Sequence, residues 1–111
     1  EVVNRTTKSV NKDISSGGVL ELHGKGLKVT GSEMYPAHVY ICDAATGTIA
    51  KNIIEEDLLA NLPTQVMFQV PAGLETGKKY IVKISTQATG TSTKLLKTPR
   101  LIVSDIVLTC V

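Results

Sequence analysis

Apolar and polar residues alternate one by one along several stretches of this chain, and this alternation constrains the fold more than any other feature. In stretches 19–23, 65–70 and 79–84, every second residue is apolar. A period of two predicts half-buried β-strands, because successive side chains of a strand point to opposite faces. Stretch 38–42 offers two possible inner faces, and we favour the face with Val39 and Ile41. The side chains expected to point inward are Leu20, Leu22, Val39, Ile41, Val66, Phe68, Val70, Tyr80, Val82 and Ile84.

Segments rich in glycine, proline and small polar residues separate these stretches, at 15–18, 24–26, 45–48 and 71–77. Further strands are expected within 2–10, 101–103 and 106–111. Short strands joined by turns of this kind are typical of a β-sandwich or barrel. We therefore predict an all-β fold, an immunoglobulin-like antiparallel β-sandwich of about seven strands. The chain has 111 residues, which fits a single domain over residues 1–111.

The segment from Asn52 to Ala60 allows two interpretations. Asn52, followed three residues later by Glu55, is typical of a helix N-terminus with a capping box, which predicts a short helix near residues 53–60. The same residues could instead form an edge strand and a loop. The sequence leaves both alternatives open.

Tyr80 stands at a corner with a recognisable pattern. Pro71, Leu74 and Gly77 precede it at intervals of three residues, and alternating apolar residues follow it. A tyrosine that enters a strand from a crossover can bury its ring while its hydroxyl bonds the backbone of the crossover. We therefore expect a tyrosine corner, with Tyr80 in the core.

The sequence carries no recognisable equipment for catalysis. It lacks a Gly-x-Ser-x-Gly elbow and the metal-ligand spacings Cys-x-x-Cys and His-x-x-x-His. His38 and Cys42 can share a strand face, but four residues of strand separate them by about 13 Å, too far for a nucleophile–base pair. His23 is likewise expected as an ordinary strand histidine. We predict that the protein is not an enzyme and that it binds no metal, cofactor or small-molecule substrate.

Cys42 and Cys110 both fall outside the segments expected for the second and sixth strands, which an immunoglobulin disulfide would join. We therefore expect two free thiols and a cytoplasmic protein. No apolar run approaches the ~18 residues of a membrane span, and no secretory signal pattern is present. Because the chain begins at Glu1 without an initiator methionine, we interpret it as the C-terminal part of a longer protein.

Charge is distributed unevenly, although the net charge is only +2. Glu55, Glu56 and Asp57 form an acidic run, whereas the segment 78–100 holds basic residues and no acidic ones. Such a segment could contact DNA phosphates without reading bases. The alternative is a solvated face that keeps the domain soluble. The candidate phosphate contacts are Lys78, Lys79, Lys83, Lys94, Lys97 and Arg100.

Four segments occur together in an order that is similar to one bacterial family. They are Gly17–Val29, Asn61-Leu-Pro63 with Val70-Pro71, Gly77-Lys-Lys-Tyr80, and Ser85-Thr-Gln87 with Leu95-Leu-Lys-Thr-Pro-Arg100. They resemble the bacterial immunoglobulin-like domain of unknown function found at the C-terminus of HU-like (histone-like) DNA-binding proteins. The last segment is the most specific of the four. The resemblance covers about Val3 to Val111 and implies a sandwich that follows a DNA-binding domain.

Two functions follow as hypotheses. The first is a non-enzymatic accessory module of an HU-like nucleoid-associated protein, which mediates protein contacts or binds the DNA backbone weakly and without sequence specificity. In that case DNA would be bound mainly through the upstream HU-like domain. The alternative is an interaction module of the periplasm or cell surface, related to other immunoglobulin-like or TIG-like domains. The sequence upstream of Glu1 distinguishes the two, because it would encode either a histone-like domain or a signal peptide.

Overall fold

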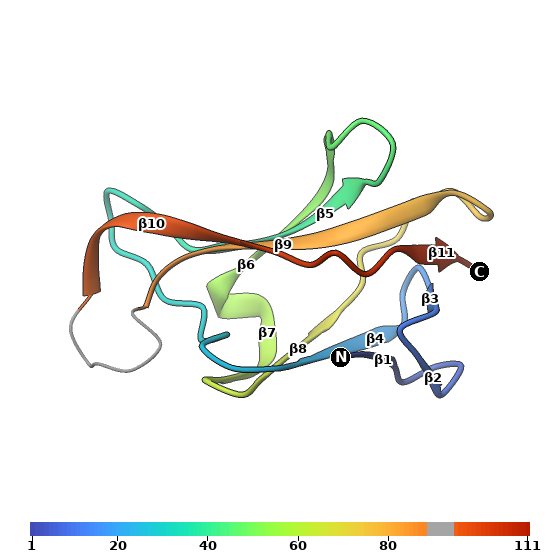
Figure 1. Ribbon diagram of the computed structural model, residues 1–111, viewed down its shortest axis with the longest axis horizontal. Coiled ribbons are helices and arrows are strands. Elements are labelled where there is room, and N and C mark those ends of the chain that lie inside the picture. Colours follow the sequence, from blue (N-terminus) through green and yellow to red (C-terminus); the bar gives the residue numbers. More distant parts are fainter. Residues whose placement is uncertain (89–94) are drawn as a thin grey trace.

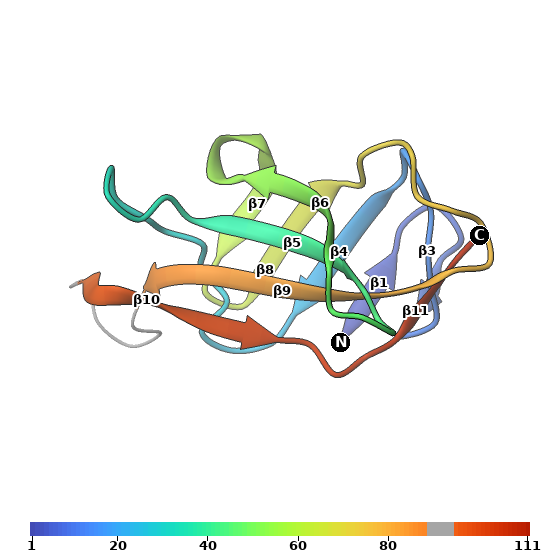
Figure 2. The same cartoon turned by 90° about the horizontal axis from the view of Figure 1, so that it is seen from above.

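The computed structural model describes residues 1–88 and 95–111, which form two β-sheets packed face to face (Figures 1 and 2). The first sheet contains β1 (Val2–Asn4), β2 (Ser9–Val10), β4 (Val19–His23), β7 (Leu58–Leu62) and β8 (Gln65–Gln69). Its order is β2-β1-β4-β8-β7. The second sheet contains β3 (Asp13–Ile14), β5 (His38–Asp43), β6 (Ile49–Ile54), β9 (Lys79–Ala88), β10 (Leu95–Val103) and β11 (Leu108–Cys110). Its order is β3-β11-β9-β5-β6, and β10 also pairs with β9.

The predicted immunoglobulin-like sandwich is confirmed, although its strands are more divided than expected. The described residues form eleven strands instead of about seven. The first immunoglobulin strand is split, because β1 pairs with β4 in one sheet while β3 pairs with β11 in the other. The last strand is split as well, since β10 and β11 pair with different parts of β9.

A buried asparagine holds the point where the chain crosses from one sheet to the other. The Asn4 side chain donates hydrogen bonds to Asp13 Oδ1 (2.8 Å) and Ser15 Oγ (3.0 Å), and it accepts one from the Thr6 backbone N–H (3.0 Å). Burial acts to raise the pKa of Asp13, but hydrogen bonds from Ser9, Thr7 and Asn4 outweigh it and leave that pKa below its ordinary value. The carboxylate therefore stays ionised and ties the two sheets together.

The core lies between the sheets and is built mainly from aliphatic side chains. Every side chain that the alternation places inward is buried, from Leu20 and Leu22 in β4 to Val82 and Ile84 in β9. Phe68 is completely buried in β8. Burying one such side chain stabilises a fold by about 1.5–3 kcal/mol, so this cluster is a main source of stability. The expected inward faces of the strands are thereby confirmed.

The short helix expected near residues 53–60 is wrong in its extent. One turn of 3-10 helix covers Glu55–Asp57, and the residue before it, Ile54, is extended and offers no side-chain cap. Asn52 lies within β6, where it pairs with Tyr40 of β5. The alternative of an edge strand is therefore correct, because pairing with β5 satisfies the backbone of this segment better than an isolated helix would.

The tyrosine corner is confirmed. Tyr80 is only 2% exposed, and its hydroxyl oxygen accepts a hydrogen bond of 3.0 Å from the backbone N–H of Glu75 in the crossover. The ring therefore fills the core at the start of β9 while its polar tip fixes the preceding turn.

Replacing Tyr80 with phenylalanine is expected to lower the free energy of unfolding by about 0.5–1.5 kcal/mol, the net value of one hydrogen bond. Urea denaturation measures the change. Tyr40→Phe serves as a control, because within the described residues the Tyr40 hydroxyl makes no hydrogen bond, and we expect almost no change there. Equal losses in both variants would contradict the corner hydrogen bond.

Candidate interaction surface

Five of the six basic residues expected to contact phosphates lie in the described part of the chain, and two of these five are engaged within the domain. Lys94 lies outside the described residues. Lys78 forms an ion pair of 2.9 Å with Asp43 Oδ2. This hydrogen bond lowers the pKa of Asp43 and raises the pKa of Lys78, so both groups remain charged and paired at neutral pH. Lys78 is therefore engaged within the domain.

Arg100 makes hydrogen bonds to two backbone carbonyl groups at one end of the sandwich. Its Nε donates a hydrogen bond of 2.6 Å to the Ala88 carbonyl at the end of β9, and its Nη2 donates to the Gly26 carbonyl. Gly26 adopts a positive φ of 65°, a backbone conformation that glycine reaches easily. The guanidinium thus joins the loop after β4 to the second sheet, and it is committed to a structural role.

Thr86 and Gln87 make further hydrogen bonds at the same end of the sandwich. The Thr86 hydroxyl accepts from the backbone N–H of Thr30 (3.0 Å) and donates to the Lys28 carbonyl (2.8 Å). The Gln87 side chain donates to the Leu96 carbonyl (2.9 Å). Thr86, Gln87 and Arg100 belong to the most specific segment of the sequence resemblance. Their hydrogen bonds show that this segment joins neighbouring loops and strands at one end of the sandwich.

Three of the predicted basic residues remain available on the surface. Lys79 and Lys83 point outward from β9, opposite to the buried Tyr80 and Val82. Four residues of strand separate these two lysines by about 13 Å. Lys97 is exposed on β10, within the part of the strand where pairing with β9 is irregular. The three charges are thus spread along two strands, β9 and β10.

The outward face of the second sheet is largely apolar around these lysines. Val103 pairs with Lys83 across β10 and β9 and is 53% exposed, and its neighbour Leu101 is 57% exposed. On the other side of β9, Tyr40 pairs with Lys83 and is half-buried. The described outward positions of β5, β6, β9 and β10 carry no carboxylate. This face therefore combines apolar side chains with positive charge.

Both cysteines and His38 lie in strands of the second sheet. Cys42 and Cys110 are buried free thiols, as expected. Burial raises the pKa of the Cys42 thiol, which disfavours the nucleophilic thiolate. His38 stacks on Tyr40, with ring centroids 5.5 Å apart. The two thiols and the His38 ring thus contribute to the packing of the domain.

Glu21 is a buried carboxylate that the sequence analysis did not single out. It lies on the outward face of β4, where His23 (2.9 Å) and Arg5 bond its two oxygens. The hydrogen bond with His23 lowers the pKa of Glu21, and Arg5 acts in the same direction. This cluster resembles an acid–base pair in composition, but Arg5 occupies the second carboxylate oxygen.

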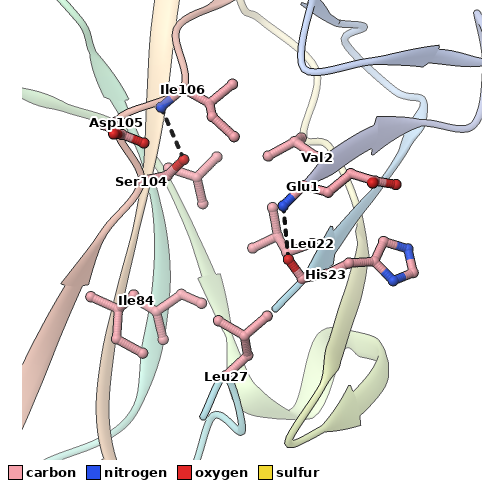
Figure 3. A pocket seen from close by; sticks show the side chains of 11 residues that line it. Glu1, Val2, Leu22, His23, Leu27, Ile84, Ser104, Asp105 and Ile106 are labelled. Atoms are coloured by element: carbon pink, nitrogen blue, oxygen red, sulfur yellow. Dashed lines mark hydrogen bonds between the residues drawn. The ribbon is translucent and has the colours of Figure 1, made fainter. Parts of the chain in front are cut away.

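An apolar pocket of about 210 Å³ opens between the sheets, at the flank formed by β1, β4 and the connection from β10 to β11 (Figure 3). Leu22, Ile84 and Ile106 are among the side chains that line it. The polar groups at its mouth bond one another: the Ile106 N–H donates to Ser104 Oγ, and the Glu1 ammonium donates to the His23 carbonyl. Nothing in this pocket forms a nucleophile–base pair.

Among the residues that the structure describes, no group of three or more histidine, cysteine, aspartate and glutamate side chains is placed to hold a metal ion. Within the same ranges, no helix is long and apolar enough to cross a membrane.

The two packed and mainly antiparallel sheets, the first strand shared between them and the tyrosine corner define an immunoglobulin-like β-sandwich domain. Residues 1–102 match the model of a family described as a domain of unknown function (DUF4469) with an immunoglobulin-like fold, and the chain belongs to this family. No curated protein matches the sequence.

One similar solved structure is described as that of a "putative bacterial DNA binding protein" from Bacteroides vulgatus ATCC 8482. The two chains are 30% identical and superpose with a TM-score of 0.81. The match covers 99% of this chain but only 45% of that protein. The chain therefore spans less than half the length of this structural neighbour.

Proposed function

We propose that this chain is a non-enzymatic interaction module of an HU-like DNA-binding protein, and that it works in the cytoplasmic nucleoid through protein contacts. The description of the structural neighbour supports a link to DNA-binding proteins. In this proposal DNA is bound by an HU-like domain elsewhere in the protein.

The outward face of the second sheet is the observation that carries this proposal. Exposed Leu101 and Val103 lie beside Lys83, with no carboxylate at the described outward positions of the strands around them. Proteins contact one another through apolar side chains rimmed by charge, whereas phosphate binding depends on clustered cations. A face of this composition suits a protein partner better than a duplex.

The dispersal of the basic residues supports the same conclusion. Lys78 is paired and Arg100 is bonded to carbonyl groups, which leaves Lys79, Lys83 and Lys97 among the described candidates. Three separated cations provide few phosphate contacts, so any binding to the DNA backbone would be weak and would fade as salt rises.

The lack of enzymatic activity is supported by the state of the reactive side chains. The pKa of Cys42 is raised by burial, and His23 is engaged with Glu21. The cytoplasmic location is supported by the two buried free thiols, since disulfides are the rule in oxidising compartments.

Duplex titration at low salt tests the proposal. The intact protein is expected to bind, whereas the 111-residue chain is expected to leave the duplex free. The triple variant Lys79→Glu, Lys83→Glu and Lys97→Glu is compared with Lys8→Glu, Lys12→Glu and Lys25→Glu, which changes the net charge equally at other exposed positions. Binding by the chain that the first triple variant loses and the second keeps would replace protein contact with phosphate contact as the function.

A further inference from the structure

Edge strands lie along two opposite sides, or flanks, of the sandwich. Figure 2 shows β6 and β7 along one flank and β10 along the other. Among the described residues, β6 pairs only with β5, β7 only with β8, and β10 only with β9. Each of these strands therefore has one side where its backbone groups are not paired with another strand.

The β10 edge is open over a short stretch. The Ser104 N–H donates to the Val82 carbonyl (2.9 Å), and the register continues with Ile102 opposite Ile84. Hydrogen-bonded pairs alternate along antiparallel strands, so the backbone groups of Leu101 and Val103 point away from β9. Pro99 and the irregular pairing before Arg100 limit this open edge to residues 101–103.

The β10 flank is basic. We define the basic flank as Leu101 and Val103 with Lys83 and Lys97. Arg100 adds a further positive charge at the same end of the sandwich, whereas Asp105 contributes one negative charge just beyond Val103. Positive charge is therefore in excess around two exposed apolar side chains.

The opposite flank has the same apolar character with the opposite charge. Leu59 and Leu62 of β7 are 58% and 51% exposed. Glu56 and Asp57 immediately precede β7, and both are exposed. We define these four residues as the acidic flank. Ile54, at the end of β6, is also exposed beside it.

We propose that the basic flank of one copy of this chain docks onto the acidic flank of a second copy. This inference rests on the proposed role as an interaction module and names the partner. Apolar side chains on both flanks would be covered, and the charges would attract. Docking of two identical basic flanks around a two-fold axis would instead bring Lys83 and Lys97 close to their own copies, and like charges repel.

Docking of two different flanks does not close on a dimer, because every added copy leaves one free flank of each kind. The product is an open row of domains, or a ring of several copies where the rotation from one copy to the next closes. Each contact is small, so free chains associate weakly. Copies held side by side on DNA by the rest of the protein would meet at a much higher effective concentration, and the row would form there.

Sedimentation of the 111-residue chain over a range of concentrations tests the proposal. The wild-type mass is expected to rise beyond that of a dimer at about 0.01 M salt and to fall back at about 1 M salt, where charges are screened within about 3 Å. Two variants each disable one flank: Leu59→Ser with Leu62→Ser, and Leu101→Ser with Val103→Ser. Each alone should associate at least about tenfold more weakly than the wild type.

The mixture of the two variants gives the sharpest result. One variant keeps its basic flank and the other its acidic flank, so an equimolar mixture is expected to form one-to-one pairs and nothing larger. The control Val10→Ser with Met34→Ser removes exposed apolar side chains elsewhere and should associate like the wild type. If either serine double variant fails to fold, two variants that remove charge are used in place of the serine variants. They are Glu56→Gln with Asp57→Asn, and Lys83→Gln with Lys97→Gln.

A wild-type chain that stays monomeric would overturn self-association. It would leave the proposed interaction role standing, because duplex titration tests that role separately. Association that stops at a dimer, or a mixture of variants that does not pair, would likewise overturn the contact between unlike flanks.

Discussion

Replacement of Phe68 with alanine is expected to lower the free energy of unfolding by about 3–5 kcal/mol. Phe68 is completely buried in β8, where Leu20 and Leu58 are its register partners on the two neighbouring strands. Removing the ring would leave a cavity that the surrounding aliphatic side chains cannot fill without moving. Small domains have free energies of unfolding of about 5–15 kcal/mol, so the variant would lose a large part of its stability.

Urea denaturation of the wild type and two comparison variants measures this effect. Phe68→Leu keeps most of the volume and should cost clearly less than the alanine variant. Met34→Ala, at a side chain that is 79% exposed, should change stability by no more than about 0.5 kcal/mol. A similar denaturation midpoint for Phe68→Ala and the wild type would mean that the core is not where the structure places it.

Replacement of Thr86 with valine is expected to cost about 2–4 kcal/mol, although valine has nearly the same shape. The Thr86 hydroxyl oxygen accepts hydrogen bonds from the backbone N–H groups of Thr30 (3.0 Å) and Ala88 (3.1 Å). Thr86 is fully buried, so valine would leave both donors without their side-chain partner. An unsatisfied buried donor costs about 1–3 kcal/mol.

Thr86→Ser is the matched control, because it keeps the hydroxyl and removes only a methyl group, which is worth about 0.8 kcal/mol. Amide hydrogen exchange adds a local measurement. In Thr86→Val, the amides of Thr30 and Ala88 should exchange faster by a larger factor than amides at the opposite end of the sandwich. Amide exchange that becomes faster by the same factor at both ends would show that the hydroxyl does not hold this segment in place.

The fold was predictable because the strongest signal in the sequence is local. Alternation along 65–70 and 79–84 depends only on neighbouring residues, and it places Phe68 and Tyr80 correctly. The tyrosine corner was predictable for the same reason, since Glu75 and Tyr80 are five residues apart. The segment 52–60 was ambiguous, because its local capping pattern competes with strand pairing to Tyr40, which is distant in the sequence.

The interactions of the basic residues were not predictable from the sequence, because their partners lie far away in the chain. Lys78 meets Asp43, and Arg100 meets the carbonyl of Gly26. No spacing rule relates such positions. The buried polar residues Asn4 and Glu21 were missed for a different reason: both lie on short strands where a polar residue looks exposed until its bonding partners are placed.

The parallel pairing of β3 with β11 gives the domain a mechanical property. The Thr109 N–H bonds the Lys12 carbonyl (3.1 Å), and the Val111 N–H bonds the Ile14 carbonyl (3.0 Å). Because these strands run in the same direction, tension that reaches β3 from its N-terminal side and β11 from its C-terminal side slides one strand along the other. Both hydrogen bonds then bear the load together, whereas strands pulled apart from one end would break them in turn. The β3–β11 pair therefore resists sliding of one strand along the other better than peeling from one end.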